Sequence, residues 1–188
     1  KRQGLIIARS VNDKTGKVVI GSPTNEKIKI AGKIDVSGHR SLTPSGTIIV
    51  RGRSVTHNGK IFARGGTGGK VNIISKDTLK LDGSIFAQGT KEKGGSVLFL
   101  SEKSISSTPK TVVDVSGANK GGRIRSLAKS TNTSSGTFKS NSKGGKGGNI
   151  DLTGDRVEIS NAKIEATGNL MGGNCLLYTS PSPRDWLQ

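Results

Sequence analysis

The sequence contains little of what many folds depend on. Its 188 residues include one Cys, one Trp, one Tyr and five Pro, and aromatic residues make up 3% of the chain. A single Cys excludes a scaffold held together by several disulfides. The few Pro, together with Gly that follows no three-residue period, exclude a collagen helix. No apolar run is longer than that of residues 97–100, so the sequence offers no membrane-spanning helix.

Acidic residues are also scarce, whereas basic residues and glycine are abundant. The chain has 30 Lys and Arg against 13 Asp and Glu, which gives a net charge of +17, and it has 28 Gly. Gly and β-branched residues are poor helix formers, so long amphipathic helices are not expected. The composition therefore predicts one Gly-rich, basic domain with little helix.

A seven-residue pattern recurs along the chain. It has a small residue first, usually Gly, an apolar residue two positions later, a small or apolar residue two positions after that, and Gly or Ser at the end. Successive copies end 24 to 28 residues apart, which is too regular for chance. The copies are residues 4–10, 32–38, 59–65, 83–89, 111–117, 136–142 and 162–168.

Two further pieces with alternating apolar and polar residues lie between these copies. The first piece opens with Gly and occupies residues 16–20, 46–50, 69–73, 95–99, 122–126 and 148–152. The second piece occupies residues 28–30, 55–57, 79–81, 105–107 and 157–159. A period of two is typical of β-strands, so the repeating unit is three short strands in about 26 residues.

Three short strands cannot bury their inward faces alone, but coiling lets equivalent strands of successive repeats pair in parallel. We therefore predict an all-β fold, a right-handed parallel β-helix (solenoid) of about seven rungs over residues 1–174. A β-sandwich would not keep one fixed period, and a propeller blade is longer than this unit. One predicted inward ladder comprises Val18, Ile48, Val71, Val97, Ile124 and Ile150. The other comprises Ile34, Ile61, Ile85, Val113, Phe138 and Ile164.

The unit Gly-Gly-x-Val-x-Ile, followed by x-Leu-x-Leu-Asp-Gly-Ser-Ile-x-Ala-x-Gly, is clearest over residues 68–89. It resembles the β-helical shaft of filamentous-haemagglutinin-type proteins, and the resemblance covers residues 4–173. It implies a large bacterial exoprotein of the two-partner secretion pathway, which acts at the cell surface and needs an outer-membrane secretion partner. The chain has no Asn-Pro dipeptide of the family's secretion domain, so we expect an internal, monomeric fragment of the shaft.

Residues 175–188 break the repeat. They carry the only Cys, Tyr and Trp and two of the five Pro. The segment resembles a translated sequencing adapter, so we expect the repeat to end near Asn174 and the tail to be an artefact or disordered. A native linker is the alternative.

The two histidines do not indicate a metal site. His57 falls where neighbouring repeats carry Ile30 and Leu81, so we expect it in the interior or at the edge of a rung. His39 is expected in a solvated loop. Neither has a metal-ligand spacing to Cys175 or to carboxylates, and we predict no metal and no cofactor.

Some parallel β-helices cleave polysaccharides, a reaction that needs two carboxylates facing one sugar bond. Position four of the recurring pattern forms one outward column, and its acidic members are Asp35, Asp114 and Glu165. Between them lie Phe62, Phe86 and Lys139, so adjacent rungs never present a carboxylate pair. We predict no catalytic residues and no enzyme, and a β-helical carbohydrate-active enzyme remains the alternative.

The basic residues are spread along the chain, but the solenoid turns periodic charge into stripes. Such stripes attract polyanions, which makes a basic polyanion-binding module the other alternative. One stripe comprises Lys17, Lys70 and Arg123, and a second comprises Lys33, Lys60 and Lys163. Further loop lysines are Lys91, Lys93, Lys143 and Lys146. Few aromatic residues are present to stack on bases, so no specific nucleic acid is expected. The predicted function is a structural, adhesive shaft segment that contacts surface glycans or receptors of host or neighbouring cells.

Overall fold

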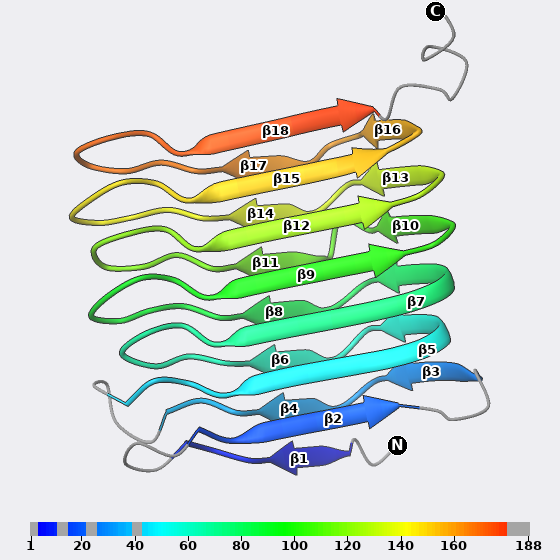
Figure 1. Ribbon diagram of the computed structural model, residues 1–188, viewed down its shortest axis with the longest axis horizontal. Coiled ribbons are helices and arrows are strands. Elements are labelled where there is room, and N and C mark those ends of the chain that lie inside the picture. The colour runs from blue at the N-terminus through cyan, green and yellow to red at the C-terminus, as the bar shows by residue number, and fades with distance from the viewer. Residues whose placement is uncertain (1–3, 11–14, 22–25, 39–42, 180–188) are drawn as a thin grey trace, which may run out of the picture.

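The computed structural model describes residues 4–10, 15–21, 26–38 and 43–179. Within these residues the strands are joined by turns and loops, and all strand pairings are parallel. The chain rises in Figure 1 while running left to right on the near face and returning on the far face. It is therefore a right-handed parallel β-solenoid, as predicted. The part of the chain described here contains no helix that could span a membrane.

One wall of the solenoid is a sheet of seven strands, one from each coil of the chain. Each strand comes from one copy of the recurring seven-residue pattern. In spatial order they are β1 (Leu5–Ile7), β4 (Lys33–Asp35), β6 (Lys60–Phe62), β8 (Ser84–Phe86), β11 (Val112–Asp114), β14 (Thr137–Lys139) and β17 (Lys163–Glu165).

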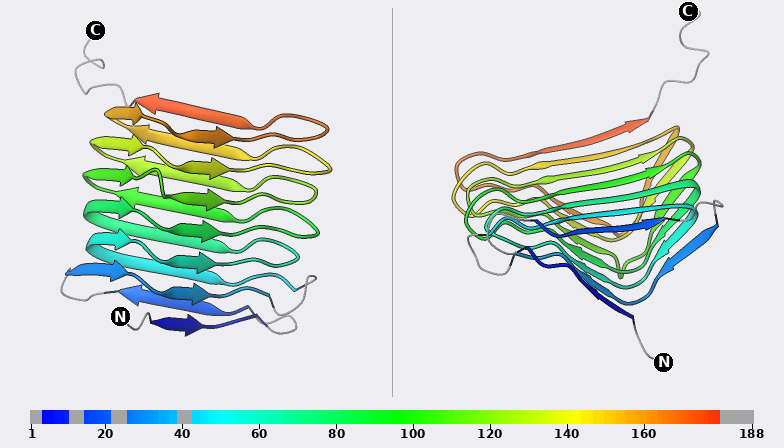
Figure 2. Two further views of the ribbon diagram at one scale, coloured as in Figure 1. Left: turned by 180° about the vertical axis from the view of Figure 1, so that it is seen from behind. Right: turned by 60° about the horizontal axis from the view of Figure 1, so that its bottom comes forward.

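The other two walls form a second sheet, of eleven strands, which bends at a corner. β5 (Thr47–His57) and β7 (Lys70–Leu81) belong to both walls, because each runs through the corner without a break (Figure 2). The front wall of Figure 1 also contains β2 (Lys17–Gly21), β9 (Ser96–Ser101), β12 (Arg123–Ala128), β15 (Asn149–Gly154) and β18 (Asn174–Thr179). The third wall contains β3 (Lys27–Ile30), β10 (Ser104–Ser107), β13 (Thr131–Ser134) and β16 (Arg156–Ile159).

The two predicted inward ladders are confirmed residue by residue. Val71 pairs with Ile48 on one side and with Val97 on the other, and Ile85 pairs with Ile61 and Val113. All twelve members are buried except Ile164, which is partly buried and packs against the others. β-branched side chains suit this interior, because their stiff rotamers stack from coil to coil on a pleated surface.

Before residue 174, the structure differs from the expected strand pattern in two places. The strands expected at residues 46–50 and 55–57 are both part of β5, and those at 69–73 and 79–81 are both part of β7. β13 was not expected at all, because its sequence Thr-Asn-Thr-Ser has no apolar alternation. Its inward residues are Asn132 and Ser134, of which Asn132 is fully buried and pairs with Ile105 and Val157.

Regular pairing extends past the expected end of the repeat. β18 crosses the predicted boundary at residue 174 and pairs with β15 in register, so that Cys175 lies beside Ile150. All six residues of β18 are exposed. Residues 180–188, the rest of the tail, lie outside the described part of the chain.

Candidate functional site

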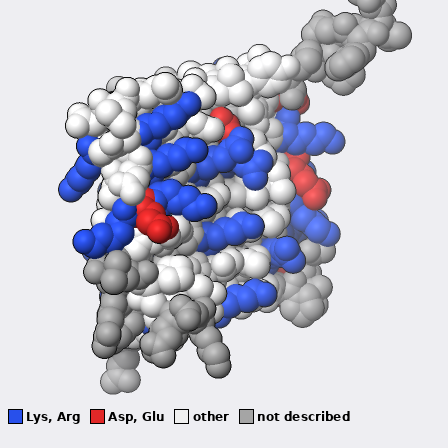
Figure 3. Space-filling model, turned by 60° about the vertical axis from the view of Figure 1, so that its left-hand side comes forward, with Lys and Arg blue, Asp and Glu red and all other residues white. Residues whose placement is uncertain are grey.

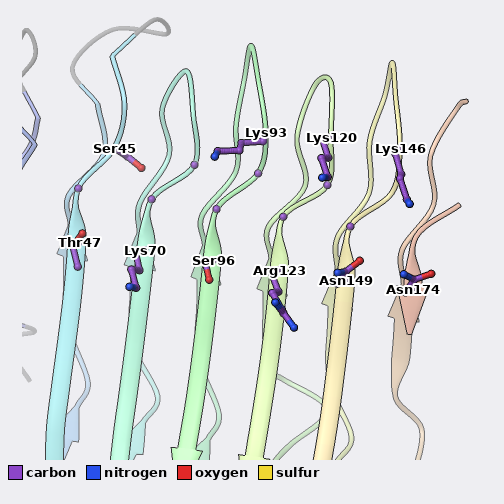
Figure 4. A pocket seen from close by; sticks show the side chains of 18 residues that line it. Ser45, Thr47, Lys70, Lys93, Ser96, Lys120, Arg123, Lys146, Asn149 and Asn174 are labelled. Carbon is purple, nitrogen blue, oxygen red and sulfur yellow. The ribbon is translucent and has the colours of Figure 1, made fainter. Parts of the chain in front are cut away.

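A groove of about 580 Å³ runs across successive coils, where the loops from the seven-stranded sheet enter the front wall. We call it the basic groove. Figure 4 shows its polar lining residues in two rows, one on the loops and one at the starts of the strands. The labelled residues are Ser45, Thr47, Lys70, Lys93, Ser96, Lys120, Arg123, Lys146, Asn149 and Asn174.

Glycine pairs form the floor of the groove because the backbones of successive coils touch there. The N–H of Gly95 donates to the carbonyl of Ala87 within its own coil (2.7 Å), and that of Gly94 donates to the carbonyl of Lys120 on the next coil (2.9 Å). A Cβ on Gly122 would overlap the carbonyl oxygen of Gly95. No described Gly has a positive φ, so backbone conformation does not explain these glycines. Glycine is required here because a side chain would overlap the backbone of the neighbouring coil. The groove therefore follows from the fold itself.

The loop side of the groove carries one lysine on each of three successive coils. Lys93, Lys120 and Lys146 pair directly in a parallel ladder, and Met171 takes this position on the following coil. Adjacent strands of a parallel sheet lie ~4.8 Å apart, so these backbones repeat at that distance. All three lysines are exposed.

The strand side of the groove alternates between cations and neutral polar side chains. In register, Thr47 pairs with Lys70, Lys70 with Ser96, Ser96 with Arg123, and Arg123 with Asn149. A cation therefore stands on every second coil here, with a hydroxyl or amide between.

Most of these cations have no acidic partner among the residues that the structure describes. Arg123 is bound to Asp151, with its Nη2 2.8 Å from a carboxylate oxygen. Lys70, Lys93, Lys120 and Lys146 form no ion pair with any residue that the structure describes. Figure 3 shows this side of the molecule, where blue side chains recur from coil to coil with few red ones between them. The groove thus concentrates positive charge.

Of the two predicted stripes of basic residues, one forms a column at the basic groove, and the other contains lysines that are paired with carboxylates. Lys17, Lys70 and Arg123 do share one column, as expected from the repeat, although Lys17 does not line the groove. In the other stripe, Lys33 lies 3.7 Å from Asp35 and Lys163 lies 2.7 Å from Glu165.

That second stripe is also broken along the seven-stranded sheet. Lys33 pairs with Lys60, but Ser84, Val112 and Thr137 occupy this position on the three coils before Lys163. Its charge is partly neutralised and interrupted, whereas the loop side of the basic groove carries, on each of three successive coils, a lysine without an ion pair to a described residue.

Lys120 is absent from the predicted stripes, and Lys93 and Lys146 were expected only as separate loop charges. A signal for all three is present, because each directly precedes a Gly-Gly pair. Alternation of apolar and polar residues identifies strands only, so it does not reveal this column of loop lysines.

The outward column of carboxylates is arranged as the sequence predicts. Asp35 pairs with Phe62, Phe62 with Phe86, and Phe86 with Asp114, so no two carboxylates are adjacent. The rings of Phe62 and Phe86 stack with centroids 5.5 Å apart, and the guanidinium of Arg64 lies over both.

Two carboxylates of this column, Asp35 and Glu165, have a lowered pKa and are held in the charged form. Burial opposes ionisation of Asp35, but hydrogen bonds from Ser37 and Arg9 outweigh it and lower the pKa of that carboxyl. The hydrogen bond from Lys163, helped by Lys139, likewise lowers the pKa of Glu165. A general acid for glycoside cleavage needs a raised pKa, which neither group has.

His57 lies in the core between Ile30 and Leu81 and is fully buried, as its repeat position predicts. Neither ring nitrogen makes a hydrogen bond of good geometry. Burial lowers the pKa of His57 to about 4, and a contact with the Ser84 backbone opposes this only in part. His39 lies outside the described residues. In the described ranges, no three His, Cys, Asp or Glu side chains come together as a metal site.

The coiled parallel strands, three walls and stacked ladders define a β-solenoid protein. Residues 9–83 and 111–170 match the haemagglutinin repeat family, and the chain belongs to that family. No curated protein and no solved structure matches the chain. The family suggests a secreted, adhesin-like exoprotein in which repeats of this kind build a structural shaft.

Proposed function

We propose that this segment is a non-catalytic shaft of a secreted bacterial surface exoprotein, and that its outer face serves adhesion. The observation that carries the proposal is the unbroken register of the inward ladders from coil to coil. Stacking accounts for the buried apolar positions and for most Gly positions, and a solenoid of this kind extends by adding further coils. Its partners are glycans or receptors on host or neighbouring cells, and an outer-membrane secretion partner exports the parent protein.

The absence of catalysis is proposed from the carboxylate column. Hydrogen bonds from Ser37 and Arg9 hold Asp35 ionised, and those from Lys163 hold Glu165 ionised, while aromatic residues or lysine separate the acidic positions. Incubation with pectin, alginate and other uronates, followed by product detection, tests this. We expect no turnover. Turnover that Asp35→Asn or Glu165→Gln abolishes would show that the segment is an enzyme.

Adhesion can be tested with beads coated with the 188-residue chain. We expect coated beads to adhere to cells that display acidic surface glycans, and the adhesion to weaken with added salt because screening reduces charge contacts. Beads coated with the Ile85→Asp variant are the matched control, since it has nearly the same charge without the stacked core. Equal adhesion of both would indicate a general effect of net charge and would contradict a role for the folded surface.

A further inference from the structure

We propose that the basic groove binds one extended polyuronate chain, which lies along the solenoid axis with one sugar per coil. This inference rests on the proposed adhesive function and identifies the class of its ligand. Four lysines of the groove form no ion pair with a described residue. Their neighbouring positive charges favour the binding of an anionic ligand.

The spacing of the charges selects the kind of anion. Lys93, Lys120 and Lys146 repeat once per coil, at ~4.8 Å between adjacent strands. A polyuronate carries one carboxylate on every sugar, and each sugar of an extended 1,4-linked chain advances it by a similar distance. In a two-fold extended chain the carboxylates of successive sugars point to opposite sides, so alternate carboxylates face the loop lysines. The others face the strand side, where Lys70 and Arg123 stand two coils apart.

The strand side of the groove suits the remaining groups of a sugar. Ser96 and Asn149 alternate with the cations, and Thr47 continues the row. Hydroxyl and amide groups both donate and accept hydrogen bonds, as sugar hydroxyls do.

The floor of the groove argues against an extended acidic peptide. A peptide strand binds a sheet edge through free backbone groups. Here the N–H groups of Gly94, Gly95 and Gly121 already donate to carbonyls of the chain itself. Nucleic acid is disfavoured for a different reason, because none of the described residues that line the groove is aromatic and could stack on bases.

The test is calorimetric titration of the 188-residue protein with de-esterified polygalacturonate in the presence of a calcium chelator. We expect binding that weakens as salt is added. Oligogalacturonides should bind more tightly with increasing length up to about the number of coils that line the groove, and no more tightly beyond it. Fully methyl-esterified polymer, which has lost its carboxylates, should not bind.

Two triple variants separate the groove from overall charge. The first is Lys93→Gln, Lys120→Gln and Lys146→Gln, which we expect to weaken binding by about tenfold or more. The second removes the same charge from exposed lysines outside the groove, as Lys80→Gln, Lys110→Gln and Lys129→Gln, and should change affinity by less than about twofold. Circular dichroism checks that both variants fold.

The inference is overturned if both triple variants lose affinity equally, or if the esterified polymer binds as well as the acidic one. Single-stranded DNA or heparin that binds at least as tightly as polygalacturonate would also overturn it, in favour of general attraction to polyanions. Ultraviolet absorbance and reducing-end assays on the same samples report cleavage. Cleavage would refute the non-catalytic shaft, whereas absence of both binding and cleavage would refute the groove ligand alone.

Discussion

Ile105 on one coil pairs directly with Asn132 on the next, so an amide side chain continues a ladder of apolar ones. Asn132 is fully buried, and both polar atoms of its side chain form hydrogen bonds. Its amide nitrogen donates to the carbonyls of Ser126 (2.7 Å) and Thr153 (3.0 Å), and its oxygen accepts from the Ser126 hydroxyl (3.1 Å). The amide thereby links the front and third walls of the solenoid.

We expect Asn132→Ala to lower the free energy of unfolding by about 2 kcal/mol, because it removes buried hydrogen bonds and leaves the Ser126 hydroxyl without its acceptor. Asn132→Asp should be worse, since it buries a charge. Urea denaturation measures both. Thr133→Ala, one residue along on the outward face, is the control and should have little effect. If the control costs as much as Asn132→Ala, the amide network does not stabilise the coil.

Asn132 also shows where sequence reasoning succeeds and where it fails. The ladders of Val71 and Ile85 were predictable, because stacking demands apolar residues at one repeat position and period-two alternation reveals them. β13 was not predicted because the sequence does not distinguish a buried Asn that hydrogen-bonds to backbone carbonyls from an Asn exposed to solvent. The same holds for the candidate site. The column of Lys70 and Arg123 follows from strand periodicity, whereas Lys120 belongs to the separate row of loop lysines, whose pairing alternation does not describe.

The buried His57 predicts a stability that depends on pH. Its pKa is about 4 in the folded chain and 6.5 ordinarily, so the unfolded chain takes up a proton first as the pH falls. The stability associated with neutral His57 is full above pH 6.5 and is lost progressively as the pH falls toward 4, by up to about 3 kcal/mol.

His57→Leu should remove that dependence, because Leu occupies the same ladder position as Leu81 without a titrating group. The measurement is chemical denaturation of both proteins at several pH values between 4 and 7. If the free energy of unfolding changes with pH in the same way for both proteins, the pKa of His57 does not differ between the folded and unfolded states as its burial implies.

Glycine in the groove floor is required by close backbone approach. We expect Gly122→Ala to destabilise the chain by about 2–3 kcal/mol, because the new Cβ would overlap the carbonyl oxygen of Gly95 and force the coils apart. Gly172→Ala is the matched control, since no atom lies within 4 Å of the Cβ it would add. Thermal unfolding compares the two. A similar loss of stability in both variants would mean that replacing Gly by Ala is unfavourable in itself. It would contradict steric overlap as the reason for glycine at position 122.

The inward and outward faces of the strands can be tested with two substitutions to the same residue. Ile85 is fully buried between Ile61 and Val113, so Ile85→Asp places an unpaired carboxylate in the core and should cost about 4 kcal/mol or more. Lys80 on β7 is exposed, so Lys80→Asp should leave the stability nearly unchanged even though it alters the charge further. Urea denaturation followed by circular dichroism distinguishes them. Because a strand that slips by one residue exchanges its two faces, a large loss from Lys80→Asp together with a small one from Ile85→Asp would mean that the register is wrong.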